Sequence, residues 1–287
     1  MFSIIIPSFN NLRYLQLCIN SIKKNSSYEH EIIVHVNEGS DGTLDYLSKN
    51  NINYTHSEEN IGLCSAVNIA ANKSIMDYIL YSHDDMYFLP GWDNCLIEEI
   101  KKTKDDMFYL SSTQISPNGP GPKGIEHIQY DAGTDIDSFN EKKLLGTFNS
   151  FEFSDLQGTH WAPHLISKNI WTKVKGFSEE FNPGFASDPD LNMKLWNIGV
   201  RYFKMVSNSR VYHFSSITTR KKNQITRNKG KKTFLKKWKI TPDFFAKHYL
   251  KRGEIFDGPL ENVPKKNLFY YIELLLVKIK YFIAIFK

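Results

Sequence analysis

Apolar runs alternate with segments of helical period through the first 113 residues, and this alternation restricts the chain to few folds. Continuous apolar or β-branched runs lie at 2–6, 31–36, 52–56, 77–82 and 107–113. Between them, apolar residues recur at helical spacing, as at 12–22, 43–49, 62–73 and 92–102. Strand–helix–strand repetition with short connections predicts a mostly parallel central sheet, with right-handed crossovers and flanking helices. We therefore expect an α/β fold.

The regular pattern weakens between residues 116 and 158, where Asn118-Gly119-Pro120-Gly121-Pro122 cannot continue a strand or a helix. Such a length predicts a functional excursion rather than a bare connection. Beyond it we expect strands at 161–167, 200–206 and 211–214, and helices at 168–175 and 190–198. We expect one domain over 1–219, with halves of about 1–115 and 116–219, followed by a basic and helical segment over 220–287.

Composition is typical of a soluble globular protein, with 41% hydrophobic and 23% charged residues among 287. Cys18, Cys64 and Cys95 form no CxxC pair and leave an odd count, which favours a reducing compartment over a disulfide framework or a zinc site. The first residues lack the basic and apolar regions of a signal peptide. We expect a cytoplasmic protein.

Basic residues gather in one segment. Residues 220–239 hold ten Lys or Arg and no Asp or Glu, although the whole chain has a net charge of only +5. This segment could attract phosphates, anionic lipid or nucleic acid. Binding of nucleic acid favours aromatic residues interleaved with the lysines, and only Phe234 and Trp238 occur there. We expect no nucleic-acid partner.

The last residues, 267–287, predict an amphipathic helical appendage. One face is apolar, and Glu273, Lys280 and Lys287 lie opposite. Charges interrupt the segment too soon for a comfortable membrane span. Two alternatives remain open: the helix packs on its own domain or a partner subunit, or it lies in a membrane interface and makes the protein peripheral at the inner face of the membrane. The sequence gives no indication of oligomeric state. The predicted apolar face consists of Leu268, Tyr271, Ile272, Leu275, Ile279, Phe282, Ile283 and Phe286.

Adjacent carboxylates follow the apolar run at 77–82. His83, Asp84 and Asp85 stand where the strand ends, at the edge of an open α/β sheet where ligands bind. Side-by-side carboxylates repel each other, so a cation or a solvated position must accommodate them. The pattern predicts Mn²⁺ or Mg²⁺ carrying a diphosphate. The alternative is a solvated acidic turn.

Several such features occur in a fixed order, and the succession resembles glycosyltransferase family 2, the inverting sugar transferases of the GT-A fold, over residues 2 to 215. The features are Ile4-Ile5-Ile6-Pro7-Ser8-Phe9-Asn10, Asn37-Glu38-Gly39-Ser40-Asp41-Gly42-Thr43, Glu59-Asn60-Ile61-Gly62 with Asn68, His83-Asp84-Asp85, Gly176-Phe177, Ser187-Asp188-Pro189-Asp190-Leu191 and Val211-Tyr212-His213. The resemblance implies a nucleoside-diphosphate sugar as donor and a glycan or lipid-linked acceptor.

On the donor side, the resemblance implies that the nucleotide is held by Pro7, Ser8, Asn10, Glu38, Asn60, Gly62, Asn68 and Asp84. Family members usually carry two Asp residues where this chain has Asn37 and Glu38. A carboxylate at 38 can still accept the imide N–H of uracil, which favours a UDP-sugar, although guanine also offers N–H donors.

The resemblance matches Asp85 to the metal-binding aspartate of the family, with His83 in place of the first acidic residue. His83 either ligates the metal through its imidazole or contacts ribose or the core. His213 ends a short strand where the family often presents a histidine to the metal or the diphosphate. The alternative for His213 is a structural role.

Asp188 matches the family's catalytic base, which deprotonates the acceptor hydroxyl. The competing interpretation is an N-cap, with Pro189 in the first helical position. Asp190 then starts the helix or contacts the acceptor. His160 and Trp161 would wall the acceptor pocket, although Trp161 could equally be a core residue.

The sequence thus predicts a metal-dependent inverting glycosyltransferase of surface polysaccharide or glycoconjugate synthesis, with the basic run as a lid over the diphosphate. The rivals are a nucleotide-sugar-binding protein without turnover and a sugar-phosphate nucleotidyltransferase. The second rival needs a glycine-rich basic loop after its first strand, and Ser8-Phe9-Asn10-Asn11 has neither glycine nor lysine.

Overall fold

The computed structural model describes residues 1–118, 126–158, 161–215 and 223–286, and within them ten strands form one sheet. The main path runs β3-β2-β1-β4-β9-β6-β10-β5, with β7 beside β6 and β8 beside β10. Strands β1 to β4 are parallel where they pair, as are β6 and β10, whereas β9 is antiparallel to both of its neighbours. The strands are β1 (Phe2–Phe9), β2 (Glu31–Asn37), β3 (Asn53–Ser57), β4 (Tyr78–Tyr81), β5 (Met86–Phe88), β6 (Phe108–Ser116), β7 (His127–Gln129), β8 (Leu156–Gln157), β9 (His164–Ser167) and β10 (Tyr202–His213).

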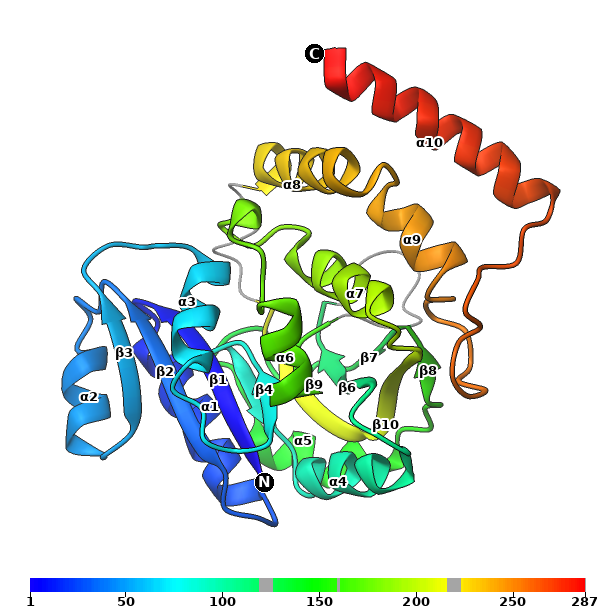
Figure 1. Cartoon of the computed structure of the whole chain (residues 1–287). Helices are drawn as coiled ribbons and strands as arrows, with labels where there is room; N and C mark the ends of the chain where they lie inside the picture. Colours follow the sequence, from blue (N-terminus) through cyan, green and yellow to red (C-terminus); the bar gives the residue numbers. More distant parts are fainter. Residues whose placement is uncertain (119–125, 159–160, 216–222, 287) are drawn as a thin grey trace.

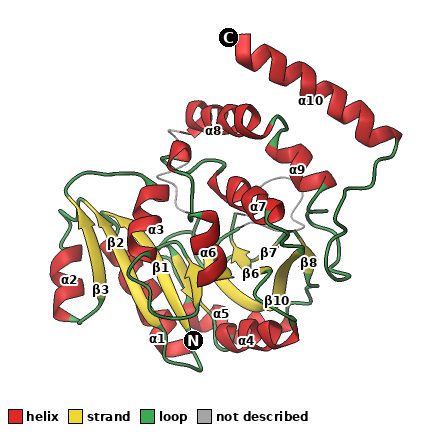
Figure 2. Ribbon diagram, in the orientation of Figure 1, coloured by secondary structure: helices red, strands yellow, loops and turns green. Residues whose placement is uncertain are grey.

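Helices cover the sheet in layers (Figures 1 and 2). Helix α3 packs on β1 and β2, and α6 on β4 and β9, whereas α1 packs against β5 and α4 against β10. The helices are α1 (Leu12–Asn25), α2 (Thr43–Lys49), α3 (Leu63–Ala71), α4 (Trp92–Lys102), α5 (Glu141–Thr147), α6 (Lys168–Val174), α7 (Ser187–Asn197), α8 (Asn223–Trp238), α9 (Pro242–His248) and α10 (Leu268–Phe286), with short 3-10 turns η1 (Phe148–Ser150) and η2 (Glu179–Phe181).

The predicted α/β class is confirmed. One local difference concerns the strands expected at 200–206 and 211–214, which form the single strand β10 with a register shift between Val206 and Arg210. The polar residues of this bulge read as a loop in the sequence, yet a bulge accommodates extra residues without ending a strand. The excursion at 116–158 contains the weak elements β7, α5, η1 and β8. The boundary expected near 115 falls inside β6, and both predicted halves contribute strands to the same sheet.

The segment beyond residue 220 does not behave as one appendage. Phe234 of α8 and Phe244 and Phe245 of α9 are buried in the same hydrophobic cluster as the central strands. Helix α10 lies at the periphery beside α8 and α9 (Figure 1), and its buried residues are Tyr270 and Val277. The core therefore includes α8 and α9, whereas α10 adds little to it.

A buried ion pair fixes α4 to β10 and provides a test of the packing. Lys204 donates to Glu99 at 2.7 Å and lies 2.7 Å from Asp155, and the Lys204 and Glu99 side chains are 7% and 2% exposed. We expect Lys204→Met to lower the free energy of unfolding by about 3–5 kcal/mol, because it removes the buried cation that faces both Glu99 and Asp155. Urea denaturation measures this change.

Lys102→Met is the matched control, because Lys102 also pairs with Glu99 but its side chain is 64% exposed. We expect it to change stability by less than about 1 kcal/mol. Equal losses in the two variants would show that burial does not decide the strength of this interaction.

Candidate active site

Three loops meet at the carboxyl edge of the parallel strands, and side chains tie them together. Ser8 of β1 donates its hydroxyl to Asp84 at 2.7 Å, across to the loop after β4. Asn10 donates to Glu38 at 3.1 Å and accepts from the backbone of Gly39, in the loop after β2. The structure thus brings together four of the predicted nucleotide-binding residues, with Pro7 beside them in β1.

The two adjacent aspartates do repel each other in this arrangement. Burial, and then the charge of Asp85, raise the pKa of Asp84 to about 7, although the hydrogen bond from Ser8 opposes the rise. A carboxyl group with a pKa so far above its usual value gains stability in its ionised form from a nearby cation or from a hydrogen-bond donor of a ligand.

His83, Asp85 and His213 form a compact cluster, with the donor atoms of all three within 4.8 Å of one another. His213 Nε2 lies 3.2 Å from Asp85 Oδ1 and 3.5 Å from His83 Nδ1, and His83 Nδ1 lies 3.9 Å from the same carboxylate oxygen. The sequence separates His213 from the other two residues by more than a hundred positions. Strand β10 brings it there because it pairs antiparallel with β5, placing His213 opposite Met86.

Gln114 determines how His213 faces this cluster. Its amide Nε2 donates to the carbonyl of Ala162, so its Oε1 faces His213 Nδ1 at 3.1 Å and must accept a hydrogen from it. A neutral His213 therefore presents the lone pair of Nε2 toward the Asp85 carboxylate. Two acceptors facing each other at 3.2 Å require a proton or a cation between them.

The donor set fits a divalent transition-metal ion. Burial and the neighbouring His213 lower the pKa of His83 to about 4, so this imidazole is neutral and can act as a ligand. Two imidazoles with one carboxylate suit Mn²⁺ better than Mg²⁺, which prefers an all-oxygen shell.

Asp188 lies on the first turn of α7, beside a buried histidine. His164 of β9 is directly opposite Tyr81 of β4 in the sheet register, and its Nε2 is 3.7 Å from Asp188 Oδ1. Both nitrogens of His164 and this oxygen of Asp188 are buried, and none has a hydrogen-bond partner among the described residues. The sequence analysis missed His164, although a histidine inside an apolar strand was a usable signal.

The N-cap interpretation of Asp188 is wrong. Ala186 precedes the helix and no side chain caps it, so Asp188 is the second helical residue and Pro189 the third. The Asp188 side chain is 24% exposed and free of any capping bond. Its carboxylate therefore lies at the positive end of the helix dipole without accepting a capping hydrogen bond from the backbone.

The cluster of His83, Asp85 and His213 lies in the same region of the molecule as Asp188. The charges of Asp85 and Asp188 both act on His83, where they oppose the lowering of its pKa by burial and by His213. The ring of Tyr81 bridges them, at 5.5 Å from His83 and 5.0 Å from His164. The two predicted carboxylates are therefore not on opposite sides of the fold.

The turn before α3 positions two further predicted residues, and a third has a different role. Asn60 accepts from the backbone of Gly62, whose φ of +83° and contact with Asn182 leave no room for a side chain. Asn68 instead donates to the carbonyl of Phe177 and accepts from its N–H, both within 2.9 Å. Its amide holds α3 to the segment before η2, so the structure gives Asn68 a structural role rather than the expected nucleotide contact.

The acceptor-binding role predicted for Asp190 does not fit its position. Asp190 is fully buried and accepts from Ser178 at 2.6 Å and Trp238 at 2.8 Å, with Lys237 at 2.9 Å. The Asp190 carboxylate, for which the sequence predicted a contact with the acceptor, instead binds α8 to the rest of the protein. It also commits Lys237 of the basic run to the protein rather than to a diphosphate. The stretch 216–222 of the predicted lid lies outside the described residues.

Trp161 is partly buried and contacts charged side chains of the same chain. Its indole N–H donates to Glu126 at 2.8 Å, and the Arg252 guanidinium lies 4.9 Å from its ring. The neighbouring acceptor candidate, His160, lies outside the described residues.

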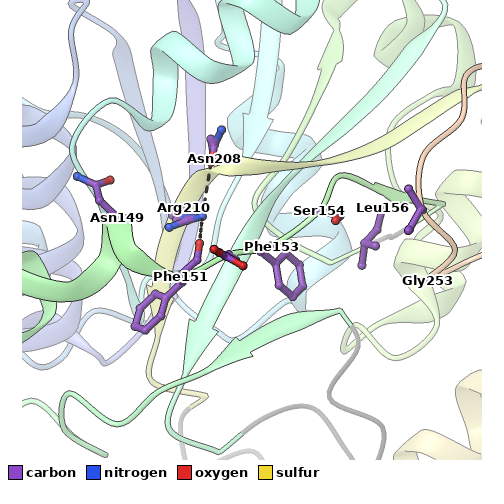
Figure 3. Close-up of a pocket in the computed structure, with 10 residues that line it drawn as sticks. Asn149, Phe151, Phe153, Ser154, Leu156, Asn208, Arg210 and Gly253 are labelled. Carbon is purple, nitrogen blue, oxygen red and sulfur yellow. Dashed lines mark hydrogen bonds between the residues drawn. The ribbon is translucent and has the colours of Figure 1, made fainter.

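A hollow of about 650 Å³ lies elsewhere, beside β10 and the loop after η1 (Figure 3). Arg210 points into it, but carbonyls of Ser207 and Phe151 already hold its guanidinium at 2.9 and 2.8 Å. The residues lining this hollow include none of the predicted site residues.

Comparisons with known proteins identify the family and the fold. The family model of glycosyl transferase family 2 matches residues 3–163. The chain is 24% identical over 232 residues to chondroitin synthase of Pasteurella multocida (strain Pm70), covering 77% of this chain and 22% of that protein. It is 29% identical over 212 residues to an uncharacterized glycosyltransferase of Rickettsia bellii, covering 70% of this chain and 28% of the relative. The chain thus spans less than a third of the length of these curated relatives.

Solved structures show the same fold. S. aureus TarS (residues 1–349) superposes with a TM-score of 0.55 at 19% identity, covering 74% of this chain and 60% of that one. GalNAc-T7 superposes with a TM-score of 0.56 at 17% identity, covering 74% and 43%. Because the family model matches more than half of the 287 residues, this protein belongs to glycosyl transferase family 2.

Proposed function

We propose that this protein transfers a sugar from a nucleoside-diphosphate sugar, with UDP as the favoured nucleotide, to a hydroxyl of a glycan or lipid-linked acceptor, and inverts the anomeric configuration. The observation that carries the proposal is the arrangement of His83, Asp85 and His213 in the same region as Asp188. TarS has been solved with UDP and with UDP-GlcNAc, and GalNAc-T7 with UDP, GalNAc and Mn²⁺. Synthesis of a surface polysaccharide or glycoconjugate is the setting we infer.

On the donor side, Glu38 would accept the imide N–H of the base, and Ser8 with Asp84 would line the nucleoside. These groups lie at the carboxyl edge of β1, β2 and β4, where Asn10 donates to Glu38 and Ser8 donates to Asp84. Asp85, His83 and His213 would hold Mn²⁺. The ion, when bound, would neutralise charge on the diphosphate as it leaves.

On the acceptor side, Asp188 would take the proton of the attacking hydroxyl. The new bond forms between that oxygen and the anomeric carbon, while the bond from this carbon to the diphosphate oxygen breaks and its electron pair leaves with the nucleotide. His164 Nε2 lies 3.7 Å from Asp188 Oδ1, and it would close to hydrogen-bond distance when substrate binds and hold the carboxylate in position.

Thermal-shift measurements with uridine, guanosine, thymidine and cytidine diphosphates test the proposed donor. A ligand that binds only the folded state raises the melting temperature, so we expect UDP with Mn²⁺ to raise it most, and UDP without metal to raise it less. Turnover is tested by measuring the UDP that the protein releases from UDP-GlcNAc, either by hydrolysis or by transfer. No stabilisation by any of the four diphosphates in the presence of Mn²⁺ would refute the proposal.

His164 provides a separate prediction within the site. We expect His164→Leu to lower kcat by about 10²-fold, because a small displacement of a reacting group costs this much, while the UDP-dependent shift in melting temperature stays unchanged. His164→Gln keeps an N–H donor and should recover part of the rate. Equal rates for the two variants would show that His164 only fills space.

A further inference from the structure

The outer side of α10 is an apolar surface that no described part of the chain covers. Leu268, Phe282 and Phe286 are 76%, 57% and 85% exposed. Isolated apolar residues on a surface are ordinary, but a continuous apolar helix face marks an interaction site. The other exposed apolar residues of the helix are Phe269, Tyr271, Ile272, Leu275, Leu276, Ile279, Ile283 and Ile285.

A different stripe of the same helix makes the contacts to the protein. Tyr270 and Val277 are buried, and Leu274, Tyr281 and Ala284 pack beside them at the spacing of helical turns. Helix α10 meets α8 and α9 on this side, and Tyr270 packs on Phe244. The apolar face predicted from the sequence is thus the outer one. The helix is apolar on both sides, and its own domain accounts for only one of them.

Lysines border the outer face. Lys278 is a helical-turn neighbour of Leu275 and Phe282, and Lys280 of Leu276 and Ile283, so one exposed lysine lies along each edge of the apolar arc. The acidic residue of the helix, Glu273, lies on the inner side, within 2.6 Å of Lys247 and His248. No charge in the described helix therefore opposes an anionic surface facing the outer side.

The whole carboxyl-terminal segment is complementary to such a surface. Residues 220–287 hold 18 Lys or Arg and five Asp or Glu, a net charge of +13 in a chain whose total is +5. Residues 1–219 are consequently acidic by 8 charges. Helices α8, α9 and α10, which hold nine of these 18 basic residues, lie on one side of the molecule (Figure 1).

We propose that α10 lies in the headgroup region of a bilayer containing anionic phospholipid, with its outer apolar face among the acyl chains and the lysines of the carboxyl-terminal segment at the phosphates. An apolar arc with lysines at its borders is the arrangement that lies in the plane of a membrane. None of the described helices is long and apolar enough to cross one. Membrane binding of this kind does not depend on the transfer reaction. Such binding would also bring the active site near a lipid-linked acceptor, and this part of the proposal rests on the proposed function.

Sedimentation of the full chain with vesicles tests the proposal. We expect binding to vesicles with about 30 mol % phosphatidylglycerol, at least tenfold weaker binding to pure phosphatidylcholine, and a decline of the former in about 0.5 M NaCl. Equal binding to both vesicle types would refute the role of the lysines. No binding to either would refute the proposal, whatever the activity of the enzyme.

Variants separate the two contributions. Ile279→Glu with Phe282→Glu should reduce vesicle binding by roughly tenfold or more, because it places charges in the apolar arc. Ile75→Glu is the control, since Ile75 is 75% exposed outside this segment. Lys278→Glu with Lys280→Glu should also weaken binding by roughly tenfold, and Lys49→Glu with Lys73→Glu, which alters the charge equally elsewhere, should not. Unchanged melting temperatures confirm that each variant is folded.

Sedimentation velocity without lipid tests whether a second copy of the chain covers this face instead. If a second copy of the chain covers α10, the protein will form a concentration-dependent dimer that Ile279→Glu with Phe282→Glu abolishes, and the vesicles will not compete for it. That result would overturn the membrane proposal. A monomer that binds anionic vesicles through the outer face would support it.

Discussion

Asp188→Asn is expected to lower kcat of sugar transfer by about 10²–10⁴-fold, the range in which a general base contributes to catalysis. The amide keeps the size and position of the side chain on the first turn of α7 but cannot accept the proton of the attacking hydroxyl. Donor binding should persist, because the cluster of His83, Asp85 and His213 and the loops after β1 and β2 do not change. Steady-state kinetics with a UDP-sugar, together with the UDP-dependent shift in melting temperature, measure the two effects separately.

Asp190→Asn is the matched control for this experiment. Asp190 is two residues away on the same helix, but its carboxylate is buried against Trp238 and Lys237 rather than facing a site. Its replacement should lower the melting temperature and leave kcat of the folded enzyme within a few fold. A rate for Asp188→Asn close to that of the unaltered enzyme would exclude this residue as the base. If donor binding also failed, the fault would lie in the donor site instead.

Asp85→Asn is expected to weaken Mn²⁺ binding by more than about 10²-fold and to abolish most transfer at ordinary metal concentrations. The substitution removes the charged ligand between His83 and His213, and a neutral amide is a poor substitute. Isothermal titration with Mn²⁺ and UDP gives a readout that does not depend on turnover. Asp77→Asn, at the other end of the same β-run and exposed, should bind Mn²⁺ like the unaltered protein.

Gln114→Leu refines the same prediction. Gln114 is not a ligand but fixes the orientation of His213 through its 3.1 Å contact, and outer residues of this kind contribute about 10–100-fold to metal affinity. We therefore expect weaker Mn²⁺ binding, with transfer restored when Mn²⁺ is raised. Mn²⁺ affinity unchanged in both Asp85→Asn and Gln114→Leu would show that the cluster is not a metal site.

Strand and helix positions in the first half could be read from the sequence because they depend on local signals. The α2 and α4 boundaries, Thr43–Lys49 and Trp92–Lys102, agree with the predicted ones. Apolar runs of β-prone residues and helical spacing are properties of neighbouring residues, which do not require knowledge of the fold. The same signals place Glu38, Asp84 and Asp85 after strands and Ser8 at the end of the first strand, and parallel strands bring those ends to one edge.

Some site features depend on which strands become neighbours, which the sequence pattern did not reveal. The register of β9 against β4 places His164 beside Tyr81, and the bulged strand β10 carries His213 to Asp85. The roles of Gln114 and Asn68 likewise depend on a backbone partner far away in the chain.

The sequence by itself determined the α/β class, the order of the loops at the sheet edge and one apolar face of the last helix, because short-range periodicity and residue chemistry suffice for these. Only the tertiary structure decided that Asp190 anchors α8 while Asp188 remains available, and that the outer face of α10 is left uncovered. Both outcomes depend on which groups reach one another across the packed core, and that competition for partners is a property of the whole fold.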